Sequence, residues 1–312
     1  MRMGGRLHSS ADGVSDSCTF ATALIVYSLG FSGTVAAREI IARALPFLQA
    51  ELLPNGVWKY WTADHPGRQS MPPDVDDTAC ISHTLRAHGL EVPDNRRLLA
   101  ANRDRRGRFY TWLAPRLAPP PRNVDYWRIV LGQVRTRARS RAFWTNNNLS
   151  PKDVAAVVNA NVLLYLGDCR ATGRVSDYLH DVLRSEGEAD SDQWYRSRFA
   201  FYYAVSRCAY AGIESVTPLL DVIVERILAA AGAGGVIGAD ALDTAQAVCA
   251  LQNCGHSGAD LDSAVEFLLS RQSAEGGWSI APFYFGGDVQ FGSEEVSTGF
   301  ALEALSRYRA GG

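Results

Sequence analysis

The stretch DVAAVVNANVLLYLG, residues Asp153–Gly167, is made almost entirely of small and apolar residues and ends in a glycine. A helix of this composition lacks a polar face, so it can be buried on all sides. A glycine just after the last turn suits the left-handed backbone in which many helices end. The stretch therefore predicts a helix inside the protein rather than on its surface.

Similar stretches recur along the chain, with small residues early, large apolar residues later and usually a closing glycine. The other five are Cys18–Gly30, Val75–Gly89, Arg196–Gly212, Ala239–Gly255 and Glu295–Ala310. Between them lie amphipathic stretches whose regularly spaced charges indicate outward-facing helices. The clear ones are Thr34–Ala50, Val175–Arg184, Ser215–Ala230 and Ala259–Arg271.

Six inner helices that alternate with outer helices are typical of a closed α/α barrel, and strand signals are weak throughout. No single hairpin of this kind could bury its own apolar face. We therefore predict an all-α fold, a single α/α6 barrel over residues 1–312. The region of about 102–148 is the least regular, contains Pro119-Pro120-Pro121, and is expected to form an insertion over one rim.

The composition narrows the function. The formal charge of -2 gives no basic excess to suggest nucleic acid. None of the six cysteines forms a CxxC pair, which favours buried, reduced thiols in a reducing compartment. Residues Met1–Gly13 contain no apolar signal-peptide core, and no run of 18 apolar residues exists that could cross a membrane. The sequence predicts a cytoplasmic protein.

Three carboxylates crowd the start of one expected inner helix. Asp74, Asp76 and Asp77 directly follow Pro72-Pro73. Helix capping is one explanation, because Asp is favoured at a helix N-terminus and interacts well with the helix dipole. The other explanation is chemical: adjacent carboxylates cannot all ionise easily, so one is held protonated. Such a group would be a Brønsted acid aimed into a cavity.

Three segments resemble class II terpene cyclases, the family of squalene–hopene cyclases and class II diterpene cyclases. Asp74-Val75-Asp76-Asp77-Thr78-Ala79 is similar to the DxDD motif of that family. Gly56–Trp61 resembles the Gly/Trp segment before the acid, and Gln272–Trp278 resembles the QxxxGGW repeat. The resemblance covers nearly the whole chain, but as one barrel only. A homodimer, a separate partner or the irregular insertion would then replace the second barrel as a lid.

The resemblance implies an isomerase that cyclises a linear isoprenoid after protonating it. Asp76 would be the acid, and Asp74 and Asp77 would tune and orient it. Because one barrel encloses little volume, a C15 or C20 prenyl diphosphate is the expected substrate, with the diphosphate retained. Aromatic faces would stabilise the cations, and the candidates are Trp58, Tyr60, Trp61, Trp144, Tyr202, Tyr203, Phe283, Tyr284 and Phe285. Trp58, Trp61 and Tyr284 are favoured because they flank the motifs.

Polar residues complete the predicted site. Asn159 and Asn161 lie on the inner helix expected beside the acid, and one of them should face the cavity or bond near the acid. Arg105 and Arg139 represent two arginine clusters of the insertion. The default interpretation of either cluster is a solvated face or a flexible loop, and the alternative is a site for a diphosphate head group. The metal-binding DDxxD signature is missing, so no cofactor is needed for initiation, and Mg²⁺ would assist only head-group binding.

Other uses of such a barrel remain open. A protein prenyltransferase needs an Asp-Cys-His zinc site, but Glu294–Arg309 contains neither Cys nor His. A glycosidase needs two carboxylates across a sugar, which Asp76 with Glu294 or Glu295 could imitate. A degenerate barrel that binds a lipid or a partner is the non-enzymatic alternative.

Overall fold

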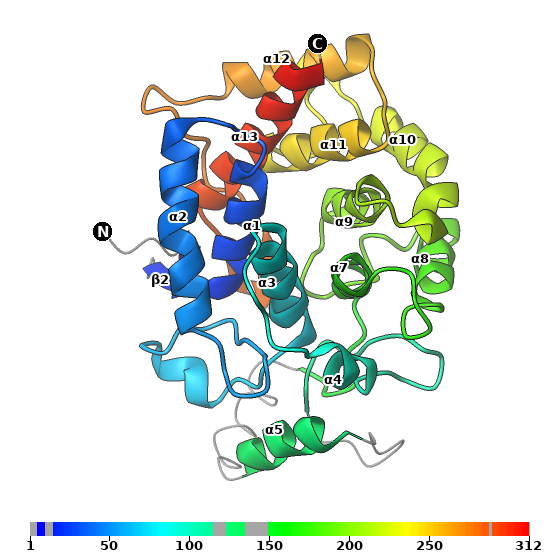
Figure 1. The fold of residues 1–312 in the computed structure, drawn as a ribbon. Coiled ribbons are helices and arrows are strands. Elements are labelled where there is room, and N and C mark those ends of the chain that lie inside the picture. The colour runs from blue at the N-terminus through cyan, green and yellow to red at the C-terminus, as the bar shows by residue number, and fades with distance from the viewer. Residues whose placement is uncertain (1–4, 10–14, 115–122, 135–148, 287–288, 312) are drawn as a thin grey trace.

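A closed ring of six helices forms the centre of the protein in this computed structural model, which describes residues 5–9, 15–114, 123–134, 149–286 and 289–311. The ring helices are α1 (Thr19–Leu29), α3 (Val75–Ala87), α7 (Ala156–Leu166), α9 (Arg198–Tyr210), α11 (Ala241–Asn253) and α13 (Glu294–Gly311). Each contacts the next, and α13 returns to contact α1 (Figure 1). These are the six predicted inner stretches, so the predicted α/α barrel is confirmed.

An outer layer of amphipathic helices covers the ring. Its members are α2 (Val35–Ala50), α4 (Arg96–Ala100), α8 (Val175–Arg184), α10 (Leu220–Ala229) and α12 (Ala259–Ser270), with 3₁₀ turns at Pro66–Gln69, Glu214–Leu219 and Ala233–Gly235. In α8 the buried side chains recur at helical spacing and face the ring, as expected of a surface helix. Helix α5 (Val124–Val134), from the predicted insertion, lies outside the ring in Figure 1.

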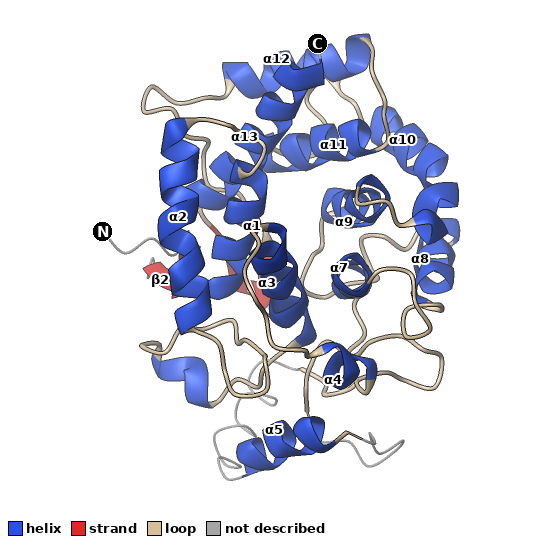
Figure 2. Ribbon diagram, viewed as in Figure 1, coloured by secondary structure: helices blue, strands red, loops and turns tan. Residues whose placement is uncertain are grey.

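A small antiparallel sheet is the feature that the helical prediction missed. Its order is β2-β1-β4-β3, with β1 at Gly5–Ser9, β2 at Ser15–Cys18, β3 at Tyr284–Gly286 and β4 at Val289–Gly292 (Figure 2). The strands are three to five residues long, too short for a clear alternating pattern. Two come from each end of the chain, and the pairing of β1 with β4 joins these ends, which no local pattern predicts.

Helix ends follow the glycine prediction at most positions. Gly167, which closes the stretch quoted first, has a φ of 71°, and Gly89 has a φ of 74°. Gly30 differs: its φ of -56° is right-handed, because the chain there continues in a tight turn before α2. No helix of the described residues is both long and apolar enough to cross a lipid bilayer.

Two tryptophans tie outer helices to the inner helices that follow them. Trp58 donates from Nε1 to the carbonyl of Leu48 at 2.8 Å, and its backbone N–H donates to Thr78 Oγ1 at 3.2 Å. Trp278 repeats both bonds at the same sequence spacing, to Leu268 at 2.8 Å and to Thr298 at 3.1 Å. Both rings are fully buried. The two motif segments therefore serve the same packing role at opposite ends of the chain.

The tryptophan bond can be tested by removing its donor. Trp278→Phe keeps an aromatic ring but leaves the Leu268 carbonyl without its partner, so the free energy of unfolding should fall by about 1–3 kcal/mol. Denaturant unfolding followed by circular dichroism measures this. Trp58→Phe should lose a similar amount, and Ile280→Ala, at a half-exposed position of the same loop as Trp278, serves as the control. Equal stability of Trp278→Phe and the wild type would contradict this role.

Candidate active site

The first turn of α3 is fixed by Asp74. Its Oδ1 accepts the backbone N–H of Asp77 at 2.7 Å, as a helix cap does. Val75 N–H donates to the carbonyl of Thr111 at 2.9 Å, which anchors the segment before the helix to residues 111–113. Capping thus accounts for Asp74 alone. Asp76 and Asp77 lie within the first turn, and both are buried.

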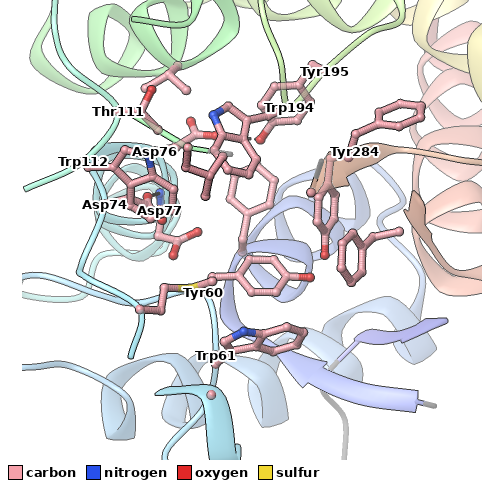
Figure 3. A pocket seen from close by; sticks show the side chains of 18 of the residues that line it. Tyr60, Trp61, Asp74, Asp76, Asp77, Thr111, Trp112, Trp194, Tyr195 and Tyr284 are labelled. Atoms are coloured by element: carbon pink, nitrogen blue, oxygen red, sulfur yellow. Dashed lines mark hydrogen bonds between the residues drawn. The ribbon is translucent and has the colours of Figure 1, made fainter. Parts of the chain in front are cut away.

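A pocket of about 300 Å³ opens beside these carboxylates. Asp74, Asp76 and Asp77 lie on one side of it and Tyr284 on the opposite side (Figure 3). The rest of the wall is mostly aromatic: Phe20, Tyr60, Trp61, Trp112, Trp194, Tyr195, Phe285 and Phe291. Such a wall removes water from the carboxyl groups and presents ring faces to any ligand.

Asp76 is held by two donors from distant segments. Its Oδ1 accepts from Asn161 Nδ2 at 2.7 Å, and its Oδ2 accepts from the hydroxyl of Tyr195 at 2.6 Å. Burial raises the pKa of Asp76, while Tyr195, Asn161 and the charge of Arg207 lower it and only partly offset burial. The Asn161 amide that faces Oδ1 can only donate, whereas the Tyr195 hydroxyl can donate to Oδ2 or accept from it, so the acid proton belongs on Oδ2.

Asp74 and Asp77 form a second acidic pair, which holds one proton between its two carboxyl groups. Burial raises the pKa of Asp77 well above its usual range, and the charge and hydrogen bond of Asp74 raise it further. Burial raises the pKa of Asp74 to about 7, and the bond from Asp77 lowers it. Asp77 is therefore the protonated partner that donates to Asp74. Its proton is engaged within the pair, whereas the proton of Asp76 lies beside Tyr195.

Asp192 holds the loop that brings Tyr195 to the acid. Its Oδ1 accepts the backbone N–H groups of Trp194 and Tyr195 at 2.8 and 3.1 Å. Its Oδ2 accepts Val157 N–H in the first turn of α7 at 3.1 Å. One buried carboxylate thus joins the loop to the helix that carries Asn161, so both donors to Asp76 keep a fixed relation.

The structure brings part of the predicted site together. Trp61 and Tyr284 line the pocket, together with Tyr60 and Phe285. Asn161 contacts Asp76 directly. Asn159 faces away: its amide exchanges two hydrogen bonds with the backbone of Phe109, which locks that segment to α7.

Other predicted residues lie elsewhere. Trp58 lies in a separate core cluster with Leu48, where its ring packs between α2 and α3. The prediction that Trp58 contacts the substrate is therefore wrong. Tyr203 lies deeper in the barrel and donates to Glu303. Arg105 lines an outer groove with Arg174 and Asp177, separate from the pocket that contains Asp74, Asp76 and Asp77. Arg139 and Trp144 fall outside the described residues.

The carboxylate pair that a glycosidase would need, Asp76 with Glu294 or Glu295, does not form. Glu294 and Glu295 are exposed at the start of α13 and do not line the pocket. Within the described ranges, no group of three or more His, Cys, Asp or Glu side chains is placed to hold a metal ion.

Sequence reasoning missed Trp112, Trp194, Tyr195 and Arg207. Trp112 and Trp194 pack edge to face at 5.4 Å between ring centroids and close one side of the pocket. Trp194 and Tyr195 are adjacent aromatics in a loop before an inner helix, a signal like the one that singled out Trp61. Arg207, in contrast, had no signal beyond being a charge in an otherwise buried helix.

The ring of paired helices belongs to the class of α/α barrels found in terpene cyclases, as comparison with solved structures shows. Type II terpene cyclase MstE from Scytonema superposes with a TM-score of 0.69 at 15% identity, over 96% of this chain and 90% of that one. A protein from Actinoplanes gives a TM-score of 0.70 at 15% identity, covering 95% and 91%. At such identities the likeness establishes the fold.

A longer enzyme shares the barrel as well. ent-Copalyl diphosphate synthase from Streptomyces platensis superposes with a TM-score of 0.58 at 23% identity, over 93% of this chain but only 50% of the synthase. No known protein-family profile matches the chain, and no curated protein matches its sequence.

The shared proton makes stability depend on pH. Because the folded-state pKa values of Asp74 and Asp77 are raised, folding binds protons at this pair, and the stability that the pair contributes is fully present below about pH 4 and is lost as the pH rises through 7. We expect the Tm to fall from pH 5 to 8, and to fall less in Asp77→Asn, which cannot ionise. Differential scanning fluorimetry measures this. The exposed Asp260→Asn is the control, and an unchanged slope in Asp77→Asn would contradict the assignment.

Proposed function

We propose that this protein is a class II terpene cyclase, which starts ring closure of a linear isoprenoid by protonating it. The observation that carries the proposal is Asp76, a buried carboxyl with two fixed donors that faces an aromatic pocket. A carboxyl group exposed to water would be ionised at neutral pH and could not serve as this acid. Burial keeps the proton in place, and the donors stabilise the carboxylate left behind.

The initiating step transfers one proton. The O–H bond at Asp76 Oδ2 breaks, and the proton adds to the less substituted carbon of the last double bond at the tail of the substrate. In an epoxide it adds to the oxygen instead, and the C–O bond to the more substituted carbon breaks. The positive charge develops at a tertiary carbon, and neighbouring double bonds attack it in turn to close rings. Loss of a proton from the last cation, or addition of water, ends the reaction and restores the proton balance. Tyr195 and Asn161 hold the carboxylate meanwhile.

The aromatic wall suits the cations that follow. Tyr60 and Tyr284 pack edge to face with centroids 5.3 Å apart, and Tyr284 stacks on Phe291 at 5.1 Å. Tyr60 also meets Trp61 edge to face at 4.5 Å. Rings fixed by one another present their negative faces to a developing cation. The wall would thus guide charge away from Asp76 along the folded chain.

The pocket volume bears on the substrate. About 300 Å³ is at the small end of the range for ligand sites, which favours a C15 or C20 chain over C30. A variant of MstE has been solved in complex with geranylgeranyl dihydroxybenzoate, described as its substrate, and the Streptomyces enzyme is named for a diphosphate product. A prenyl diphosphate that keeps its head group remains our proposal.

Among the described residues that line the pocket, no side chain is cationic and could pair with a diphosphate head group. Arg196 is nearby, with its guanidinium 4.5 Å from the centroid of Phe285. Mg²⁺ would act only on the diphosphate, outside the proton transfer. A second copy of the chain or a separate partner would serve as the lid over the pocket.

Product formation by Asp76→Asn tests the proposal. Pure protein is incubated with C15, C20 and C30 isoprenoids, with and without diphosphate, and products are analysed by mass spectrometry before and after phosphatase treatment. The wild type should cyclise a C15 or C20 substrate, and Asp76→Asn should lose at least about 10²–10⁴-fold in rate, because the amide cannot donate the acid proton. Its Tm should not fall, since a buried carboxyl is removed.

Asp260→Asn provides the matched control, because it makes the same substitution on an exposed helix. Retention of full product formation by Asp76→Asn would overturn the acid assignment. Absence of any cyclic product from the folded wild type with every substrate would overturn the proposed function.

A further inference from the structure

A buried cation lies behind the acid, outside the substrate pocket. Arg207 on α9 is 3% exposed, and its Nη2 donates to Asn161 Oδ1 at 2.6 Å. The same amide donates from Nδ2 to Asp76 Oδ1 at 2.7 Å. One asparagine therefore links a guanidinium to the carboxyl group of the proposed acid.

Several groups surround Arg207 inside the barrel. Its guanidinium lies 4.9 Å from the ring centroid of Tyr27 and 5.2 Å from that of Tyr203. The Tyr203 hydroxyl donates to Glu303, a fully buried carboxylate that also accepts from Ser28 at 2.8 Å. Burying an isolated cation is costly, so this ring-and-carboxylate surrounding offsets the loss of water. These groups stabilise the positive charge of the Arg207 guanidinium inside the barrel.

Arg207 is separated from the substrate pocket. Together with Asn161 and Tyr203 it borders a second cavity of about 20 Å³, deeper in the barrel. That volume has room for about one water and not for an isoprenoid. Arg207 does not line the larger pocket, so it reaches Asp76 only from behind, through the Asn161 bridge and through the field of its charge.

The guanidinium decides which way the amide points. Because Arg207 can only donate, Asn161 must turn its oxygen toward α9 and its NH₂ toward Asp76. Asp76 Oδ1 then always faces a group that can only donate, which places the proton on Oδ2, where the Tyr195 hydroxyl can accept it. The cation also polarises the amide, so the N–H donated to the carboxylate is stronger than that of a neutral amide.

We propose that Arg207 is a positioning residue that acts through Asn161 to orient the proton of Asp76 and to make it a stronger acid. This inference rests on the proposed function for its catalytic consequence, while the acidity of Asp76 can be measured without substrate.

The other titratable and charged groups around this network must be considered. Around Asp76 they are Asp74, Asp77, Cys80, Asp192 and Tyr195, and around Arg207 they are Tyr27, His83, Tyr203, Cys208, Glu303 and Arg307. Burial lowers the pKa of His83 to about 4 and raises that of Cys208 to about 12, so both are neutral from pH 5 to 8. Arg207 stays charged, so between pH 5 and 8 the groups of this network that gain or lose protons are the carboxyl groups.

Arg207→Gln removes the charge but keeps an N–H donor for Asn161, and Arg207→Lys keeps the charge. The acid should weaken in the glutamine variant, so the alkaline limb of the pH–rate profile should move up by about one unit. The kcat at pH 6 should fall about tenfold, and KM should stay within about twofold. Arg207→Lys should recover most of the loss. Arg86→Gln, another arginine over a tyrosine ring, is the matched control.

Infrared spectroscopy measures the acid directly. The difference between wild type and Asp76→Asn isolates the C=O band of protonated Asp76, which is titrated without substrate. Its midpoint should rise in Arg207→Gln, stay near the wild type in Arg207→Lys, and be unaffected in Arg86→Gln. If Arg207→Gln does not fold, Arg207→Met is used instead and should raise the midpoint, because it removes the charge and leaves Asn161 in place.

An unchanged midpoint in Arg207→Gln, or an equal shift in Arg86→Gln, would overturn the inference. A raised midpoint in a protein that cyclises no isoprenoid would instead overturn the proposed function and leave the role of Arg207 in the acidity of Asp76 intact.

Discussion

A carboxyl group kept protonated inside an aromatic pocket is the constraint on which this site depends. Burial alone would make Asp76 a poor acid, because its charged form would have no partner after proton transfer. Asn161 and Tyr195 supply the partners, at 2.7 and 2.6 Å. The pKa of Asp76 is therefore set by a balance: the dry surroundings raise it, and the donors with the nearby guanidinium of Arg207 lower it less.

The barrel provides the surroundings that this balance needs. Six helices without polar faces can close only on one another, and the outer helices seal the ring from water. Trp58 and Trp278 fix two of these outer helices with equivalent hydrogen bonds, so these two tryptophans stabilise the barrel and do not line the pocket. Asp192 then positions the Tyr195 loop against α7. Packing and chemistry are thus served by different residues of neighbouring segments.

Much of the fold followed from local patterns, and much less of the site did. The inner helices were predicted because each carries its own periodicity, and the cap at Asp74 was foreseen as one of two explanations. Trp58 and Arg105 were assigned to substrate because they flank a motif or cluster in sequence. Neighbourhood along the chain does not say which way a side chain points: Trp58 turns into the core beside α2, and Arg105 lies on an outer groove.

The sequence by itself determined a helical barrel and a crowded acidic turn at the start of one inner helix, since helix periodicity and capping act over a few residues. Only the tertiary structure decided which of the three carboxyl groups receives partners. Tyr195 lies 119 residues beyond Asp76, and Asn161 lies 85 residues beyond it. Arg207 meets Asn161 across 46 residues. These contacts exist because ring closure brings α3, α7 and α9 together, and no local pattern encodes the distance between side chains on separate helices.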